Sequence, residues 1–418
     1  MGYSTVRRIM REGLTDPRNL DGIALWNSTR DVTDLTTDTG IKLWADKSGN
    51  SGVNCFVSGG AASNTATSPT VSITGNWVGS WDIAPADNTP SADHTLFSKL
   101  SGNNGLEVLL LTTGVIRVRV GDGAAVTNFD SSVANGQTDL TRYTLGITYV
   151  DNTSLNFTIN GAALGTQVVV NKVLTNAAAT ATIGTAFAGR IYSVIITGKY
   201  NFVPSGASKL ATSFVAPTTG ETWTINTSGA TGARISGARD LYQGTAANQP
   251  ILTIAAAGNY LTFDGSNDYL KAAAFALSQP ETVYFVGSQV TWTNNDGILD
   301  GFTQDSMDLY QNTSSPNITQ YAGAGGPTIT TVPVGSAAII TAVANGASSV
   351  LRHNRGAAAT GNSGTRSMNG FTLGANGLPG SFANITAQEV VVYSTAQDEN
   401  YQYRVTRLLS RRTGVLVV

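Results

Sequence analysis

Short apolar runs with an alternating pattern, separated by turn residues, follow one another along most of this chain. Leu106–Leu111 and Val115–Val120 flank a Thr-Thr-Gly turn, and this arrangement predicts a β-hairpin. In the second run, valine and isoleucine alternate with arginine, as expected of a strand with one face in the core and one in water. The pattern therefore predicts antiparallel sheets.

A second hairpin is predicted where Tyr143–Val150 and Ser154–Asn160 flank an Asp-Asn-Thr turn. Asn160-Gly161 is a type I′ turn signal, because both residue types tolerate positive φ, and it leads into Ala162–Val170. Strand follows strand through such short turns over much of the first half of the chain.

A helical pattern occurs close to the C-terminus. Ser394 and Gln397 fit a capping box, and Gly414 fits a C-cap position. Arg411 and Arg412 would complement the negative end of the helix dipole. Between these signals, apolar residues recur on one helical face: Tyr401, Val405, Leu408 and Leu409.

One stretch in the second half carries a family resemblance. Tyr260, Leu261 and Phe263 read as strand residues, and Asp264–Asp268 is a polar turn before a further apolar strand. This stretch resembles the opening strands of concanavalin A-like, laminin-G-type jelly-roll domains. The resemblance implies an antiparallel β-sandwich. Because such domains are usually binding or structural modules, it also implies recognition and not catalysis.

The first half of the chain carries a weaker copy of the same architecture. Gly22–Trp26 and Leu43–Asn50 resemble the opening of a laminin-G-type domain. A repeat of roughly 200 residues indicates duplicated domains, since solenoid repeats are roughly 20–50 residues long. The parallel runs are Trp77–Ser80 with Phe285–Ser288, and Val194–Ile196 with Val390–Val392.

The fold class expected from these patterns is all-β, with two tandem concanavalin A-like jelly-roll domains. The domains are expected at 20–200 and 220–418, and the second ends in the helix. Asn201–Thr219 contains two prolines and a glycine and is expected to be a linker. Met1–Asn19 precedes the first domain as a short arm.

Length and composition agree with this organisation. A chain of 418 residues exceeds the size of a single core. Charged residues make up 12% and the formal net charge is -2, which leaves no basic surface for nucleic acid. Cys55 has no partner for an intrachain disulfide and is expected to be buried. No segment reaches the roughly 20 apolar residues of a membrane span, and Met1–Leu14 lacks the apolar core of a signal peptide.

Catalytic patterns are not evident. Glucanases of the concanavalin A-like fold carry acidic residues that share one strand face, whereas Glu389 and Glu399, the nearest glutamates here, fall on different elements. His94 and His353 do not accompany a nucleophile motif, and no cluster of His and Cys could hold zinc. Gly323–Pro327 lacks the Lys-Ser/Thr of a phosphate-binding loop. The chain is therefore expected not to be an enzyme.

Calcium is the cofactor that the family resemblance suggests, because many laminin-G-type domains hold it on aspartate and backbone oxygens at the sandwich rim. Loop Asx residues more often stabilise turns, so the expectation is a chain without a cofactor. The candidate ligands are Asp82, Asp87 and Asp93 in the first half, and Asp296 and Asp300, beside Asn294 and Asn295, in the second.

A sugar ligand would be bound by aromatic side chains exposed in loops beside polar groups. Trp77, Trp81 and Trp292 are the candidates for this role. The alternative is that these tryptophans belong to the core, where most tryptophans of a sandwich are found.

The arm offers a further interaction surface. Val6, Ile9 and Met10 alternate with Arg7, Arg8 and Arg11 outside either expected domain. We predict that they dock onto a partner protein; the alternative is a frayed terminus.

Together these features predict a non-enzymatic bacteriophage virion protein on the exterior of the particle, either a capsid decoration protein or a head or tail fibre. Lysis would release such a protein without a secretion signal. Its expected partners are other virion proteins, further copies of itself and host-surface glycans, without nucleic acid or membrane insertion. The alternative is a carbohydrate-binding module of a secreted or cell-surface protein.

Overall fold

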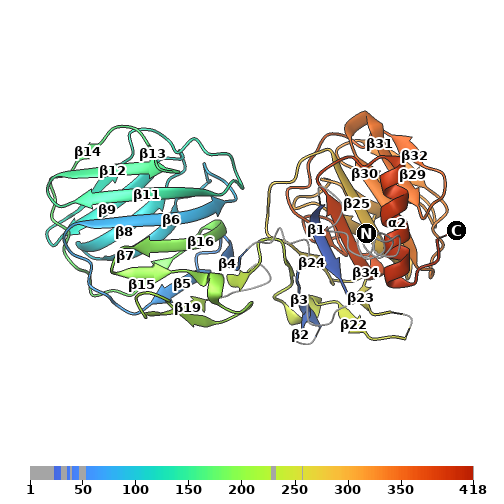
Figure 1. Cartoon of the computed structure of the whole chain (residues 1–418), viewed down its shortest axis with the longest axis horizontal. Coiled ribbons are helices and arrows are strands. Elements are labelled where there is room, and N and C mark those ends of the chain that lie inside the picture. The colour runs from blue at the N-terminus through green and yellow to red at the C-terminus, as the bar shows by residue number, and fades with distance from the viewer. Residues whose placement is uncertain are drawn as a thin grey trace, which may run out of the picture. The chain divides into compact units, whose positions relative to one another are not determined.

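The computed structural model describes residues 23–29, 35–37, 40–46, 53–226, 232–256 and 258–417. The chain divides into two compact units (Figure 1). The inserted unit is Gly52–Ala238, and the split unit combines Met1–Ser51 with Arg239–Val418. In sequence, the whole of one unit therefore lies within the other.

The inserted unit is a sandwich of two antiparallel sheets around one apolar core. Trp81 and Leu145 from one sheet and Leu106 and Val118 from the other belong to the same buried cluster. The β8 sheet has the order β10 (Val126–Asp130), β9 (Ile116–Asp122), β8 (Asn104–Leu110), β7 (His94–Ser101), β15 (Ala181–Ile183), β5 (Thr65–Ser68), β19 (Thr222–Asn226), β18 (Ser213–Val215). The β6 sheet has the order β13 (Ala162–Ala163), β12 (Ser154–Ile159), β11 (Tyr143–Val150), β6 (Trp77–Pro85), β16 (Ala188–Ile196), β4 (Cys55–Gly59), β20 (Arg234–Ser236), with β14 (Val168–Val169) on β12 and β17 (Tyr200–Phe202) on β16.

The split unit repeats this architecture. Its core brings Val283 and Phe285 of one sheet against Leu299 and Leu309 of the other. The β25 sheet has the order β22 (Ile251–Thr253), β23 (Tyr260–Asp264), β34 (Asn384–Tyr393), β25 (Glu281–Gln289), β30 (Ala338–Ala344), β31 (Ser349–His353), β32 (Ala359–Gly361), with β1 (Ile23–Ser28) on β34. The β27 sheet has the order β2 (Leu35–Thr37), β3 (Ile41–Trp44), β21 (Leu241–Tyr242), β24 (Leu270–Lys271), β33 (Thr372–Leu373), β26 (Gly297–Asp300), β27 (Asp308–Gln311), β28 (Ile318–Tyr321), β29 (Gly325–Ile329).

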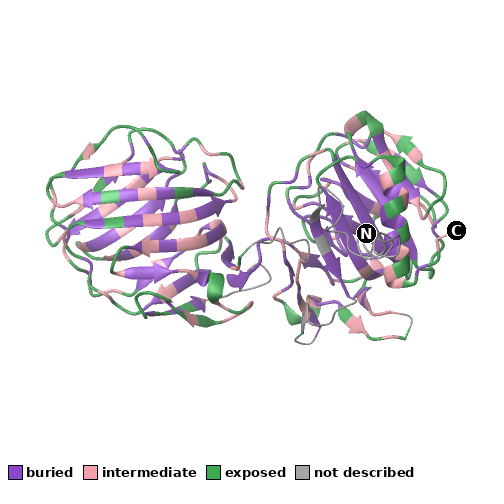
Figure 2. Cartoon of the chain, in the orientation of Figure 1, coloured by how far each residue is buried: buried purple, intermediate pink, exposed green. Residues whose placement is uncertain are grey.

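A helix, α2 (Glu399–Thr413), covers the outer face of the β25 sheet. Val405 and Leu409 of the helix pack with Tyr284 and Val391 of the sheet. Every residue of β25 is consequently buried, whereas strands of the inserted unit alternate between buried and exposed positions (Figure 2). The helix face predicted from the sequence is thus the face that packs on the sheet.

The helix starts later than the capping-box signal predicts. Asp398 is the N-cap, and its carboxylate accepts a hydrogen bond from the Tyr401 amide at 2.8 Å. Gln397 instead binds β25, because its amide donates to Thr282 Oγ1 at 3.0 Å and its side chain accepts from the Tyr284 hydroxyl. The predicted C-terminal end is confirmed, with Gly414 in the left-handed conformation at φ 79°.

Both predicted hairpins are confirmed. β8 pairs with β9 and β11 pairs with β12, each in antiparallel register. Asn160 and Gly161 have φ values of 50° and 83°, as a type I′ turn requires. The all-β fold class with duplicated antiparallel sandwiches is therefore confirmed, and the terminal helix with it.

The predicted domain boundaries at 20–200 and 220–418 are wrong. β1 pairs with β34, so a strand near the N-terminus belongs to the same sheet as a strand near the C-terminus. β3 likewise pairs with β21, on the far side of the inserted unit. Local patterns identify strands but not their distant partners, which is why the sequence alone suggested a simple tandem.

The predicted linker Asn201–Thr219 belongs to the inserted sandwich. Phe202 in β17 packs edge-on against Trp223 with ring centroids 5.1 Å apart, and both side chains are buried. β18 lies within the same stretch and extends the β8 sheet. Its prolines and glycine mark a short 3-10 turn, η3 (Pro204–Gly206), and a loop between strands.

A shared β-bulge aligns the two sandwiches. Between β6 and β16 the register shifts after Asp82↔Ser193, and between β25 and β34 it shifts after Val286↔Glu389. On this alignment Phe285 is the counterpart of Trp81, not of Trp77 as the sequence parallel suggested. The parallel between Val194–Ile196 and Val390–Val392 agrees with the alignment.

Candidate functional site

Two of the three tryptophans predicted to bind sugar lie in the core of the inserted unit. Trp77 and Trp81 are 4% and 0% exposed, and the Trp77 ring stacks on Tyr149 at 5.7 Å. Gly79 lies between them on the same strand face, and a Cβ there would come within 2.6 Å of the Trp81 ring. The prediction of a ligand role for Trp77 and Trp81 is wrong, because strand alternation directs both inwards.

Trp292 occupies a loop after β25 and is half-buried. Its indole N–H donates to the Asn317 carbonyl at 3.2 Å, which places it against the turn between β27 and β28. It is therefore the one predicted tryptophan that retains exposed surface.

The predicted calcium ligands of the inserted unit each have a separate protein partner. Asp82 makes a bidentate ion pair with Arg142, at 2.8 and 2.7 Å. Asp87 accepts from the Thr89 amide at 2.8 Å, and Asp93 accepts from the Thr112 amide at 3.1 Å. Asp87 thus has the turn-stabilising role that loop aspartates usually have, whereas Asp82 and Asp93 bind residues distant in sequence.

The candidates of the split unit also serve the fold. Asp300 is 0% exposed, and its carboxylate accepts four backbone N–H groups, those of Gly301, Asp305, Ser306 and Gly377. Burial raises the pKa of Asp300 to about 6, against the opposite effect of these donors. Asp296 is partly buried in the loop before β26, and burial raises its pKa. In the part of the chain that the structure describes, no group of three or more His, Cys, Asp or Glu side chains could hold a metal ion.

The candidate docking residues Val6, Arg7, Arg8, Ile9, Met10 and Arg11 lie outside the described residues. Their role in binding a partner stays a prediction. Within the described residues, no helix has the length and apolar character needed to cross a bilayer.

A different site emerges on the outward face of β27, β28 and β29 in the split unit. Leu309 and Ile318 point into the core, so alternation places Asp308 and Tyr310 of β27 on the opposite face. Asp308 lies directly across from Tyr321. Tyr310 lies across from Thr319, whose hydroxyl is 2.7 Å from that of Thr328 on β29. Asp308, Tyr310 and Tyr321 together are called the tyrosine face.

Asp308 is the unusual member of this face. It is only 8% exposed, and its Oδ1 atom is buried without a hydrogen-bond partner among the described residues. Burial, together with the negative charges of Asp300 and Asp305, raises its pKa well above the ordinary aspartate value. The protonated carboxyl is then favoured, which can both donate and accept hydrogen bonds. Tyr310 and Tyr321 stay half-exposed beside it.

A fixed loop borders the tyrosine face. Asp305 pairs with Arg366 at 3.2 Å, and both side chains are well exposed. Asp300 anchors the start of this loop through Gly301, and Lys271 donates to the Phe302 carbonyl at 2.8 Å. Burial lowers the pKa of Lys271 to about 8. The buried Asp300 and the partly buried Lys271 thus hold the loop in place, so the rim of the face is preorganised.

Sequence reasoning missed this face because it searched loops and tryptophans. The sequence signal for this face is the Asp-Leu-Tyr alternation of 308–310, followed by Tyr321. The strand β27 has four residues, and so short an alternating run cannot be told from a turn in the sequence.

The described glutamates do not form a catalytic pair. Glu107 pairs with Arg119, Glu389 with Arg412 and Glu399 with Arg352. Glu221 accepts from the Trp223 indole at 3.0 Å, and Glu281 is 0% exposed. His94 is buried, with its ring against Phe187, and its pKa is lowered by burial. His353 is half-exposed, and its Nδ1 lies 3.1 Å from the Thr331 hydroxyl.

No protein-family model and no curated protein matches this sequence. Among solved structures, the chain is similar to mouse laminin alpha1 domains LG4-5, with 12% identity over 82% of this chain and 93% of that one, at a TM-score of 0.34. It is also similar to domain 4 of an extracellular arabinanase from Geobacillus stearothermophilus, with 14% identity, 40% and 82% coverage and a TM-score of 0.32. Laminin G domains are thus among the similar structures, as the sequence resemblance predicted. Because these TM-scores are low, the fold is assigned from the sheets described above and not from these similarities.

Proposed function

We propose that this chain is a non-enzymatic glycan-binding protein whose ligand lies on the tyrosine face of the split unit. The observation that supports the proposal is the buried Asp308 carboxyl, which has an unpartnered oxygen beside two half-exposed tyrosines. Buried polar atoms are rarely left without a partner, so an unsatisfied one on a surface points to a ligand group.

The chemistry of the face suits a sugar. A sugar ring presents an apolar C–H face, which packs on an aromatic ring, and hydroxyls, which both donate and accept. Tyr310 and Tyr321 supply the rings, and Asp308 supplies a hydrogen-bonding group that bulk water does not compete for. Asp305 is paired with Arg366 and Asp308 favours its neutral form, so the face carries no net positive charge for an acidic glycan and a neutral one is favoured.

Binding without turnover is the second part of the proposal. Hydrolysis of a glycosidic bond needs two carboxyl groups that reach opposite sides of the scissile bond. Asp300 is an acid whose negative charge raises the pKa of Asp308, but its oxygens already accept four backbone N–H groups inside the protein. Asp305, the exposed acid beside Asp308, is paired with Arg366 at 3.2 Å, so each of the two neighbouring acids already has partners within the protein.

The setting we propose is the exterior of a bacteriophage particle, as a decoration protein or a fibre that meets host-surface glycans. Weak sugar contacts gain strength when many copies are displayed, so assembly into homo-oligomers and onto other virion proteins belongs to this proposal. The second candidate function is a carbohydrate-binding module of a secreted protein, in which a single copy of the chain would bind the glycan with the same face. Immunogold electron microscopy of intact particles tests the setting, and an absence of label on particles rejects it.

A glycan array with neutral and acidic polysaccharides tests the ligand. Neutral glycans should bind the chain, and Tyr310→Ala should weaken binding at least roughly tenfold, as loss of an aromatic anchor does. Tyr192→Ala, a half-buried tyrosine on the inserted unit, is the matched control and should bind normally. Release of reducing ends, or unchanged binding by Tyr310→Ala, contradicts the proposal.

A further inference from the structure

A second site lies in the split unit where strand β34 changes its neighbour. β23 pairs with Asn384–Ala387 of β34, and β1 pairs with its Glu389–Tyr393 segment. Gln388 falls in the gap between these partners. Its carbonyl accepts from the Thr29 amide at 2.9 Å and from the Thr29 hydroxyl at 3.0 Å, which closes the backbone at the break.

A cavity of about 390 Å³ opens over this break. Its floor is Gln388 and Glu389, one wall is Ala255, Ala256 and Gly258, and the other is the end of α2 at Thr413 and Gly414. The helix stops there because Gly414 takes the left-handed C-cap conformation, so α2 does not extend over the sheet face beyond it. The volume lies in the range of small-molecule sites.

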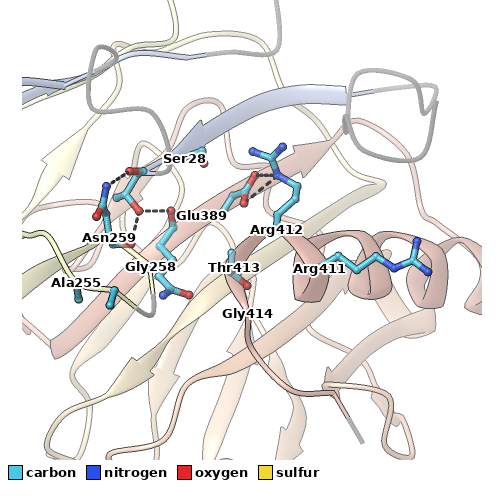
Figure 3. Close-up of a pocket in the computed structure, with 12 residues that line it drawn as sticks. Ser28, Ala255, Gly258, Asn259, Glu389, Arg411, Arg412, Thr413 and Gly414 are labelled. Atoms are coloured by element: carbon cyan, nitrogen blue, oxygen red, sulfur yellow. Dashed lines mark hydrogen bonds and ion pairs between the residues drawn. The ribbon is translucent and has the colours of Figure 1, made fainter. Parts of the chain in front are cut away.

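The floor of the cavity is polar but electrically balanced. Glu389 is 0% exposed, and its carboxylate accepts from Arg412 Nε at 2.9 and 3.3 Å, a contact seen in Figure 3. Arg411 extends away from this pair along the helix (Figure 3). Among the described lining residues, Glu389 and Arg412 cancel each other, and the charge of Arg411 at the edge of the cavity is opposed by about half a negative charge at the helix end.

Gln388 gives the cavity its strongest indication of a ligand. Its Oε1 atom is buried and has no hydrogen-bond partner among the described residues. A ligand that donates a hydrogen bond would satisfy this oxygen. Asn259 adds an amide from the opposite side, held by its own bond to the Thr29 carbonyl at 3.2 Å.

We propose that this cavity binds a single neutral sugar unit. Hydroxyl groups donate to Gln388 Oε1 and accept from neighbouring amides, while the ring's C–H face meets the small side chains of Ala255 and Ala256. An anion would meet the Glu389 carboxylate and the negative end of helix α2, and an apolar ligand would leave Gln388 unsatisfied. The site is separate from the tyrosine face, so the split unit would hold two sugar sites of different shape.

The experiment uses the full chain carrying Tyr310→Ala, which removes binding at the tyrosine face. Saturation-transfer NMR with glucose, galactose, mannose and N-acetylglucosamine as separate probes then reports on the cavity. At least one of these sugars should bind this variant. Acetate and glucuronic acid serve as anionic comparators and should bind at least roughly fivefold more weakly than that sugar.

Two further variants assign the binding to the cavity. Gln388→Leu removes the unsatisfied oxygen, and Ala255→Phe fills the space, so each should weaken the sugar signal at least roughly fivefold. Ile254→Phe is the matched control, because Ile254 is 74% exposed and does not line the cavity. Circular dichroism melting confirms that each variant folds.

The outcomes separate this site from the tyrosine face. Sugar binding that persists in Tyr310→Ala and is lost in both cavity variants supports the proposal, whatever the glycan array shows. It is overturned if none of the four sugars binds the Tyr310→Ala chain, if both cavity variants that fold bind normally, or if acetate or glucuronic acid binds as well as the best sugar.

Discussion

The β8–β9 hairpin of the inserted unit and the β27–β28 hairpin of the split unit occupy the same place in their sandwiches, but the acid on the outward face has different partners in the two. In the inserted unit, Glu107 lies across from Arg119, and the two pair at 2.7 Å. In the split unit, Asp308 lies across from Tyr321 and keeps an unpartnered oxygen. On the first face the acid is paired with an arginine, whereas on the second face an oxygen of the acid lacks a hydrogen-bond partner that a ligand could supply.

The opposite sheets of the two units differ as well. On the bulge alignment, Asp82 on β6 is the counterpart of Val286 on β25. Asp82 pairs with Arg142 at the surface, whereas Val286 lies under helix α2. The outer face of the β6 sheet is thus polar, whereas helix α2 covers the outer face of the β25 sheet. The Glu389–Arg412 ion pair is therefore buried much more deeply than the Asp82–Arg142 pair.

The largest expected effect concerns the first residue of β25. Glu281 is the counterpart of Trp77, so a carboxyl takes a core position that the inserted unit fills with an indole. Burial raises the pKa of Glu281 from 4.5 to about 8. A raised folded-state pKa means that stability is complete below the unfolded value and is lost as pH rises towards the folded value.

The free energy of unfolding should therefore fall by on the order of 5 kcal/mol between about pH 4.5 and 8 through this group alone. Glu281→Gln should remove most of that pH dependence in urea titrations at several pH values. Glu399→Gln, at a position whose side chain is 61% exposed, is the control and should keep it. A wild-type stability that does not fall between pH 5 and 8 contradicts the assignment.

The two ion pairs at the bulge provide the next test. Glu389→Ala leaves Arg412, 11% exposed, without its carboxylate and should destabilise the split unit by about 3–5 kcal/mol. Asp82→Ala breaks a pair with 51% and 24% exposed side chains and should cost about 1 kcal/mol or less. Urea unfolding of both variants measures the difference. Equal losses would show that depth of burial does not distinguish the two units.

The strands and the fold were predictable from sequence because alternation and turn signals are local. The hairpins β8–β9 and β11–β12 and the end of α2 follow from such signals. The insertion was not predictable, because the pairing of β1 with β34 depends on contacts across the whole chain. The two sites could not be predicted for the same reason. Gln388 stands out only because the strands β23 and β1 pair with β34 on either side of it. Asp308 stands out only because Tyr321 lies across from it, where the counterpart hairpin has an arginine.

Tyr321→Arg tests the comparison directly by giving the split unit the pair that the inserted unit has. The new guanidinium should pair with Asp308, lower its pKa and remove one aromatic wall. Glycan binding should weaken at least roughly tenfold, or about 1.4 kcal/mol, in isothermal titration calorimetry. Tyr192→Arg, on the inserted unit, is the control for added charge. Undiminished binding by Tyr321→Arg would place the ligand elsewhere.

The reciprocal change, Arg119→Tyr, should have the smallest effect. It recreates the tyrosine opposite an acid, but Arg119 is 37% exposed, so the lost ion pair is worth about 1 kcal/mol or less. Glycan binding should not appear on the inserted unit, since Leu109 stands where the split unit has Tyr310, and Arg117 across from Leu109 is paired with Asp130 at 2.6 Å. Calorimetry with the glycan that binds the tyrosine face, in a Tyr310→Ala background, measures this. A regained signal would mean that one tyrosine beside an acid suffices, and that the second aromatic wall of the split unit is not needed.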